Sequence, residues 1–155
     1  MNRPQIVIVS GKKNSGKTAY LQEIRQRAQK RGWQVGGFLS EAKLQNNVKT
    51  QYRLLNLQTE EQRILAWRKS DSSALATGRF AFDPTVFAWG NRFVRQQLHF
   101  PVIILDEFGP LEMRGKGWFD LLGFLLAQYR GLLFISVRPD LLSSLMHLIG
   151  TKVRT

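Results

Sequence analysis

Short apolar runs alternate with amphipathic stretches along this chain. Three runs are apolar enough for strands buried on both faces of a sheet: residues 6–9, 101–105 and 132–137. Residues 17–31 instead place apolar side chains at a helical spacing and stop at Gly32, a residue type that commonly follows helix ends. The apolar residues that show this helical spacing are Tyr20, Leu21, Ile24 and Ala28.

Further helices are predicted in the second half of the chain. Asp83-Pro84 has the N-cap and first-turn signature of a helix that runs to about Gln97. Another helix is expected from about Gly117 to Tyr129, and a short final helix from near Asp140. The buried face of the first of these is predicted to be Phe82, Val86, Phe87, Phe93, Val94 and Leu98. This alternation of strands and helices predicts an α/β fold with a mostly parallel central sheet flanked by helices.

The middle of the chain has a different pattern. Residues 33–39 and 48–57 are predicted strands, and Gln45-Asn46-Asn47 between them has turn chemistry. A third strand over residues 63–67 extends this pair into an antiparallel meander. Residues 69–78 are rich in Ser and end in Gly, which predicts a flexible loop.

Residues 11–18, Gly-Lys-Lys-Asn-Ser-Gly-Lys-Thr, match the phosphate-binding pattern G-x-x-x-x-G-K-[ST] at every position. The segment follows a predicted strand and opens a predicted helix, so several backbone N–H groups and the helix dipole point at one spot. We expect Lys17 to reach the β- and γ-phosphate oxygens and the Thr18 hydroxyl to ligate Mg²⁺. The predicted nucleotide-binding residues are Gly11, Lys12, Lys13, Asn14, Ser15, Gly16, Lys17, Thr18 and Ala19. The sequence therefore predicts binding of a nucleoside triphosphate.

An acidic pair, Asp106-Glu107, follows the apolar run at 102–105. Phosphoryl transfer needs such a second element opposite the phosphate loop, because its catalysis depends on positioning and on stabilising charge. Asp106 is predicted to hold Mg²⁺, directly or through water, and Glu107 to deprotonate the attacking water. Lys17 and Glu107 are thus the predicted catalytic residues, and a general base here favours hydrolysis over transfer to an acceptor. The alternative, an acidic pair that only faces solvent at a strand end, is less favoured because the phosphate loop is present.

Composition adds limits on the class of protein. The 155 residues fit one domain, and the absence of cysteine excludes disulfides and thiolate metal sites and is consistent with a reducing cytoplasm. No stretch approaches the length of a membrane span, and the opening apolar run is too short for a signal peptide.

Positive charge is concentrated near the N-terminus. The net charge is +12, and residues 1–53 hold eleven Lys/Arg against two Glu, a net +9. Three of these lysines lie in the phosphate loop. Others are predicted on the outer face and end of the helix 17–31, where they would attract RNA, DNA or anionic lipid or simply keep the protein soluble: Arg25, Arg27, Lys30 and Arg31. No aromatic-rich RNA motif or zinc finger accompanies this charge.

The chain resembles the small P-loop nucleoside triphosphatases described as thermophile-type or cancer-related NTPases. Besides the phosphate loop, the similarity rests on Val35-Gly36-Gly37-Phe38-Leu39-Ser40-Glu41, on Tyr52-Arg53 and on Gly78-Arg79-Phe80. Its most specific element is Leu105-Asp106-Glu107-Phe108-Gly109-Pro110-Leu111-Glu112, which is similar to the family's D-E-[IFV]-G-x-[ML]-E signature. The resemblance implies a three-layer P-loop NTPase fold with an antiparallel strand extension. It also implies Mg²⁺-dependent hydrolysis of several nucleoside triphosphates, ATP and GTP among them, to diphosphate and phosphate with loose base preference.

The sequence departs from the family at one cationic position. The family's E-V-R appears as Glu41-Ala42-Lys43, which replaces a bidentate guanidinium by a point charge. The residues after the last predicted strand, Val137-Arg138-Pro139-Asp140, are not the N-K-x-D guanine motif, so no strict GTP specificity is expected.

Several single residues are candidates with competing interpretations. Glu112 is expected to organise the loop behind Glu107. Four arginines are either a cis arginine finger or, as we favour for any one of them, surface ion-pair partners: Arg53, Arg79, Arg114 and Arg138. The four tryptophans are expected to pack in the core or at its edge, with base stacking as an alternative for Trp67. His99 and His147 are expected to be structural.

Three other functions remain open from the sequence. A small-molecule or polynucleotide kinase would need an acceptor pocket and an arginine-rich lid, but residues 69–79 contain only Lys69 and Arg79 as cations. A nucleotide-controlled RNA- or DNA-binding switch would use the basic N-terminal part. A structural protein with a vestigial site would dispense with Lys17 and Glu107.

Overall fold

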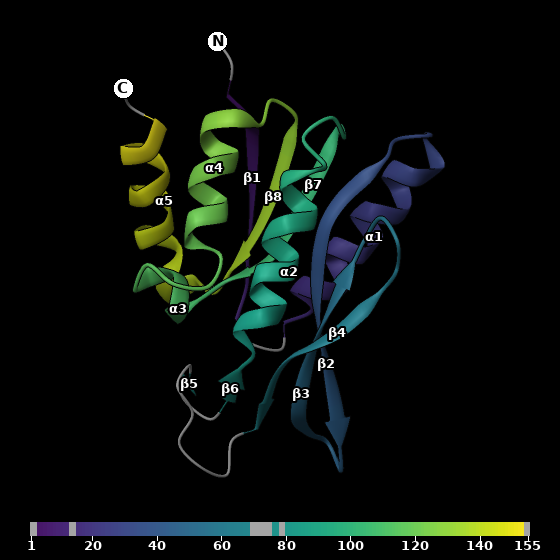
Figure 1. The fold of residues 1–155 in the computed structure, drawn as a ribbon, viewed down its shortest axis with the longest axis vertical. Helices are drawn as coiled ribbons and strands as arrows, with labels where there is room; N and C mark the ends of the chain where they lie inside the picture. The colour runs from purple at the N-terminus through teal and green to yellow at the C-terminus, as the bar shows by residue number, and fades with distance from the viewer. Residues whose placement is uncertain (1–2, 13–14, 69–75, 78–79, 154–155) are drawn as a thin grey trace.

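The computed structural model describes residues 3–12, 15–68, 76–77 and 80–153. Its strands are β1 (Gln5–Ser10), β2 (Val35–Gln45), β3 (Val48–Asn56), β4 (Gln62–Arg68), β5 (Ala76–Thr77), β6 (Phe80–Phe82), β7 (Val102–Phe108) and β8 (Leu132–Val137). Its helices are α1 (Lys17–Lys30), α2 (Pro84–Arg95), α3 (Pro110–Met113), α4 (Phe119–Gln128) and α5 (Pro139–Val153). Figure 1 shows the strands forming one twisted sheet between the helices.

The sheet has the strand order β1-β8-β7-β2-β3-β4-β6-β5 in the described residues. The pairs β1–β8, β8–β7 and β7–β2 are parallel, and every pairing from β2 to β5 is antiparallel. The predicted α/β class, with parallel central strands and an antiparallel extension, is therefore confirmed. The extension is larger than the predicted meander because β6 and β5 add to its outer edge.

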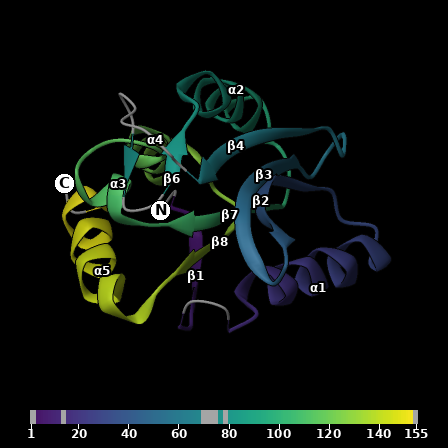
Figure 2. The same cartoon turned by 90° about the horizontal axis from the view of Figure 1, so that it is seen from below.

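Helices cover both faces of the sheet, which gives three layers. Figure 2 shows α1 on one face and α2 and α4 on the other. The core on the α1 side includes Leu21, Leu39, Ile104 and Phe134. The larger core on the other side contains side chains of α2, α4 and α5. No helix in the described part of the chain is both long and apolar enough to cross a membrane.

Two local predictions are confirmed in detail. Asn46 and Asn47 form the two-residue loop between β2 and β3, with φ angles of 53° and 62°, the left-handed backbone that a type I′ hairpin requires. Asp83 caps α2 by accepting the backbone N–H of Thr85 at 2.9 Å, with Pro84 in the first turn.

Two expectations were wrong. The final helix is not short: α5 has 15 residues, because apolar side chains such as Leu145 and Leu148 continue the helical spacing and pack on the core. Arg25 lies on the inner face of α1 rather than the outer one, since it is spaced by four residues from Leu21 and by three from Ala28, both of which are buried.

Arg25 is buried because its guanidinium finds acceptors there. It donates to the carbonyl oxygen of Leu57 at 3.0 Å and to Glu60 at 3.2 Å. The predicted flexible loop at 69–78 lies outside the described residues, except that residues 76–77 form β5.

Gly37 is the backbone position on which the β2–β7 pairing depends. Its φ is +89°, and a Cβ atom there would overlap the backbone carbonyl of Ile104 on β7. We expect Gly37→Ala to lower the free energy of unfolding by about 3 kcal/mol or more, from strain and overlap together. Denaturant unfolding measures this loss.

Gly32 is the matched control, because its φ is +81° and a Cβ atom there meets nothing within 4 Å. Gly32→Ala is expected to cost about 1 kcal/mol from backbone strain alone. Equal losses in the two variants would contradict the role of close strand approach at Gly37.

Candidate active site

The phosphate loop joins the end of β1 to the start of α1. Gly16 precedes the helix with φ 91°, and among the described residues no side chain caps this helix N-terminus and no acidic residue lies in its first turn. The helix end is thus electrostatically suited to an anion. Lys17 extends back over the loop, and its Nζ donates to the carbonyl oxygens of Gly11 at 2.6 Å and Lys12 at 3.0 Å.

The structure describes seven of the nine predicted nucleotide-binding residues in and next to this loop: Gly11, Lys12, Ser15, Gly16, Lys17, Thr18 and Ala19. Lys13 and Asn14 lie outside the described residues.

Asp106 joins the loop to the sheet. Its carboxylate is 3% exposed and accepts hydrogen bonds from the Thr18 hydroxyl at 2.8 Å, the Ser40 backbone N–H at 3.0 Å and the Ser136 hydroxyl at 2.6 Å. Burial raises the pKa of Asp106, and the three hydrogen bonds oppose that rise. Thr18 and Asp106, the two residues predicted to hold Mg²⁺, are 88 positions apart in the chain and are in direct contact.

The Thr18–Asp106 pair fits a magnesium ion. Both groups offer hard oxygen atoms, and the Thr18 hydroxyl keeps acceptor lone pairs while it donates to Asp106. The described residues contain no cluster of three or more His, Asp or Glu that would hold a metal by itself. Such a sparse protein ligand set is typical of Mg²⁺ that binds together with substrate phosphates and water.

A bulge in β7 sets the direction of Glu107. Leu105 pairs with Ile135 of β8 and Phe108 with Val137, so two residues of β7 face only Ser136 on the partner strand. Bulges of this kind turn side chains and are frequent beside active sites. Burial, and then Asp106, raise the pKa of Glu107, while the positive charge of Lys17 lowers it. Glu107 is therefore a half-buried carboxyl within the electrostatic reach of the phosphate-loop lysine.

Glu112 fixes the segment that follows Glu107, as expected. Its carboxylate is 4% exposed and accepts the backbone N–H groups of Gly109 at 2.7 Å and Trp118 at 2.9 Å. Gly117 has φ 59°, and a Cβ atom there would overlap this carboxylate. Burial raises the pKa of Glu112 from 4.5 to about 7.

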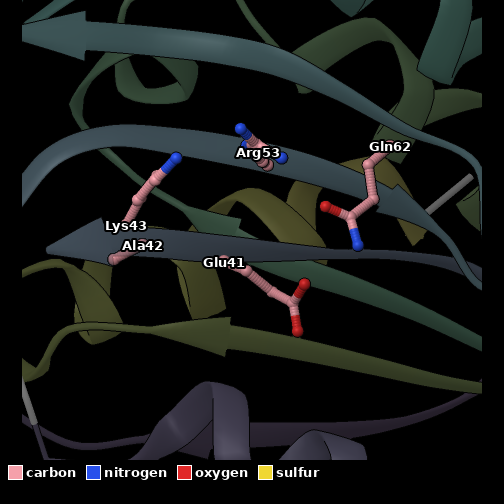
Figure 3. A pocket seen from close by; sticks show the side chains of 5 residues that line it. All are labelled: Glu41, Ala42, Lys43, Arg53 and Gln62. Carbon is pink, nitrogen blue, oxygen red and sulfur yellow. The ribbon is translucent and has the colours of Figure 1, made fainter.

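Other predicted candidates lie elsewhere. Arg53 donates to Gln51 at 2.9 Å and borders a groove of about 360 Å³ on the antiparallel extension. Figure 3 shows Arg53 on the strand between those that carry Glu41 and Gln62. The full lining of the groove is Glu41, Ala42, Lys43, Arg53 and Gln62.

The remaining candidates are spread over the molecule. Arg114 is the C-cap residue of α3, and Arg79 lies outside the described residues. Trp67 is 41% exposed, whereas Trp89 and Trp118 are in the core.

Sequence reasoning missed two of the three donors to Asp106. Ser136 is the only polar residue in the apolar run 132–137, and that isolated hydroxyl was a usable signal. Ser40 acts through its backbone N–H, so its residue type carries no signal.

Comparison with known proteins decides the family. A family model described as NTPase matches residues 6–151, a range that contains the phosphate loop, Asp106, Glu107 and Glu112. The chain belongs to this NTPase family. It is therefore a nucleoside-triphosphate hydrolase by class, and the predicted resemblance is confirmed.

Several proteins similar to this NTPase are named nucleoside-triphosphatase THEP1. Nucleoside-triphosphatase THEP1 of Caldivirga maquilingensis is 26% identical over 134 residues, which are 86% of this chain and 76% of that protein. Nucleoside-triphosphatase THEP1 of Pyrococcus abyssi is 27% identical over 130 residues, 81% of this chain and 70% of that protein.

Solved structures confirm the P-loop NTPase fold. The crystal structure of THEP1 from Aquifex aeolicus superposes with a TM-score of 0.71 at 21% identity, covering 94% of this chain and 83% of that one. The solution structure of a human cancer-related nucleoside triphosphatase superposes with a TM-score of 0.69 at 15% identity, covering 86% and 76%.

Glu112 predicts a pH-dependent stability of this NTPase. The folded chain keeps the Glu112 proton up to about pH 7, whereas the unfolded chain releases it near 4.5. Because the folded state binds more protons in this window, the free energy of unfolding falls as the pH rises through it, by about 3 kcal/mol from this group. Denaturant unfolding from pH 4.5 to 8 is the measurement.

Glu112→Gln should remove this pH-dependent contribution to the free energy of unfolding. The difference in free energy of unfolding between wild type and variant should therefore change between pH 4.5 and 8. The exposed Glu61→Gln is the control and should leave the pH profile parallel to that of the wild type. Parallel profiles for Glu112→Gln as well would show that its carboxyl does not titrate as described.

Proposed function

We propose that this chain is a Mg²⁺-dependent nucleoside triphosphatase that hydrolyses ATP, GTP and other nucleoside triphosphates to diphosphate and phosphate. We further propose that residues 1–155 act as one P-loop NTPase domain. The observation that supports this best is the 2.8 Å hydrogen bond between Thr18 and Asp106, which brings the phosphate-loop helix and the acidic strand end together.

The phosphates are bound by the loop and by the N-terminus of α1. Lys17 contacts the β- and γ-phosphate oxygens, in exchange for the loop carbonyls to which it now donates. Thr18 and Asp106 would hold Mg²⁺, which when bound would neutralise developing charge on the phosphate oxygens.

Glu107 is the general base of the proposed reaction. Its carboxylate takes a proton from a water molecule, whose oxygen attacks the γ-phosphorus while the bond to the β–γ bridging oxygen breaks. A carboxyl whose pKa is raised by burial is a better proton acceptor at neutral pH than an exposed one. Glu112 keeps the following segment in place, so Glu107 is presented by a fixed backbone.

The positions of two basic residues of α1 weaken the RNA- or DNA-binding alternative. It relied on a basic outer face of α1, but Arg25 is buried and Arg27 is paired with Glu23 at 2.6 Å. A general base beside the phosphate loop favours hydrolysis over the kinase alternative.

Phosphate release from ATP, GTP, CTP and UTP with Mg²⁺ tests the proposal. Wild type should turn over all four, with rates that differ little between bases. Glu107→Gln should lower kcat by about 10²–10⁴-fold because the water loses its base. Lys17→Ala should abolish turnover, and Lys30→Ala, at the exposed far end of α1, should leave it unchanged.

Turnover that persists in both Lys17→Ala and Glu107→Gln would place hydrolysis at a different site. Stimulation of the wild type by added RNA would instead support the nucleic-acid switch.

The metal role of Thr18 is tested by titrating Mg²⁺ at saturating nucleotide. Thr18→Val keeps the shape of the side chain and removes the hydroxyl, so the Mg²⁺ concentration for half-maximal turnover should rise by about tenfold or more. Thr18→Ser restores the hydroxyl and should restore the wild-type value. The same Mg²⁺ requirement in all three proteins would exclude Thr18 as a ligand.

A further inference from the structure

Arg138 lies at the edge of the sheet where the phosphate loop and the Asp106-Glu107 pair meet. It is the first residue after β8, and β8 lies between β1 and β7, parallel to both. The carboxyl ends of parallel strands meet at one edge, so Arg138 follows the strand between those that lead into the phosphate loop and into Glu107. The backbone N–H of Gly11, the first loop residue, donates to the carbonyl of Val137 at 3.4 Å.

The Arg138 side chain is 29% exposed and carries an unsatisfied donor. Its Nε is buried and has no hydrogen-bond partner among the described residues. The nearest carboxylate oxygen given for it, Oδ1 of Asp140, is 3.7 Å away and belongs to a side chain that is 68% exposed. The positive charge of Arg138 acts to lower the pKa of Glu107 and of Tyr52, so its guanidinium is within electrostatic reach of both side chains.

The Nε of Arg25 is also buried without a partner, but Arg25 and three further arginines each have an acceptor within hydrogen-bond distance. Arg25 binds a carbonyl and Glu60, Arg27 binds Glu23, Arg53 binds Gln51, and Arg63 binds Glu61. A buried donor without an acceptor costs free energy of folding. Arg138 differs from Arg25 because its one ion pair among the described residues is the 3.7 Å contact with the exposed Asp140, which leaves its guanidinium available to an anion.

We propose that Arg138 binds the γ-phosphoryl group and stabilises its negative charge during hydrolysis. This inference rests on the proposed function and assigns to Arg138 the part of an arginine finger supplied by the chain itself. Lys17 approaches the phosphates from α1, whereas Arg138 approaches from the end of β8, next to the base Glu107. A planar guanidinium can donate two parallel hydrogen bonds to the phosphoryl oxygens.

Two consequences separate this role from a structural one. Charge stabilisation in the transition state changes kcat, so the loss of Arg138 should lower kcat far more than it raises KM. If Arg138 contacts only the γ-phosphoryl group, it should strengthen binding of a nucleoside triphosphate but not of a diphosphate, which lacks that group.

The kinetic test compares Arg138→Gln, Arg138→Lys and the control Arg130→Gln in the full chain with Mg²⁺-ATP. Arg138→Gln should lower kcat by about 10²-fold or more, and Arg138→Lys should recover only part of the loss because it cannot bind in two places. Arg130 is exposed and lies before β8, at the opposite end of the same strand, so Arg130→Gln should match wild type.

The binding test measures Kd for ADP and for the non-hydrolysable ATP analogue AMP-PNP by calorimetry, with the thermal midpoint of each variant as a check of folding. Arg138→Gln should weaken the analogue by about tenfold or more and leave ADP unchanged. Its thermal midpoint should change little, because the only ion pair lost is the 3.7 Å contact with the exposed Asp140.

Each outcome bears on the inference. Equal weakening of ADP and AMP-PNP, a lowered thermal midpoint with normal kcat, or wild-type kcat in Arg138→Gln would overturn the assignment of Arg138 while the proposed function stands. If wild type binds AMP-PNP but releases no phosphate, the proposed hydrolysis fails, and the binding comparison still decides whether Arg138 contacts the γ-phosphoryl group.

Discussion

The buried carboxylate of Asp106 is the contact on which the arrangement of the site depends. Its donors come from α1, β2 and β8, and the carboxylate itself comes from β7. A buried carboxylate without its donors is strongly unfavourable, so these four elements are held at one edge of the sheet with a fixed spacing. The phosphate loop and the acidic strand end are thus positioned by the fold before any ligand binds, which is the form of preorganisation that favours electrostatic catalysis.

Charge around this carboxylate is arranged in two opposed groups. Burial raises the pKa of both Asp106 and Glu107, while Lys17 lowers the pKa of both. Arg138 also lowers the pKa of Glu107 from the end of the neighbouring strand. The site therefore combines two carboxylates whose pKa is raised by burial with cations that lower it. This pattern suits a reaction in which negative charge and a proton move between these groups.

Much of this could be predicted from the sequence, because the parallel strands and the phosphate loop have strong local signals. Two motifs were enough to propose Thr18 and Asp106 as ligands of one Mg²⁺, but their hydrogen bond to each other was not predicted. The burial of Arg25 could not be found from its residue type, since it depends on acceptors more than thirty positions away. The bulge at Glu107 was also hidden, because a two-to-one pairing with β8 is a property of register and not of composition.

The most direct test of the account is a crystal structure of the full chain with Mg²⁺ and AMP-PNP. The account predicts that the γ-phosphate lies between Lys17 and Glu107, with Mg²⁺ on the Thr18 hydroxyl and on Asp106, directly or through water. A water molecule in line with the γ-phosphorus should contact Glu107. A nucleotide bound away from the phosphate loop, or a Glu107 side chain directed away from the γ-phosphate, would contradict the proposed site.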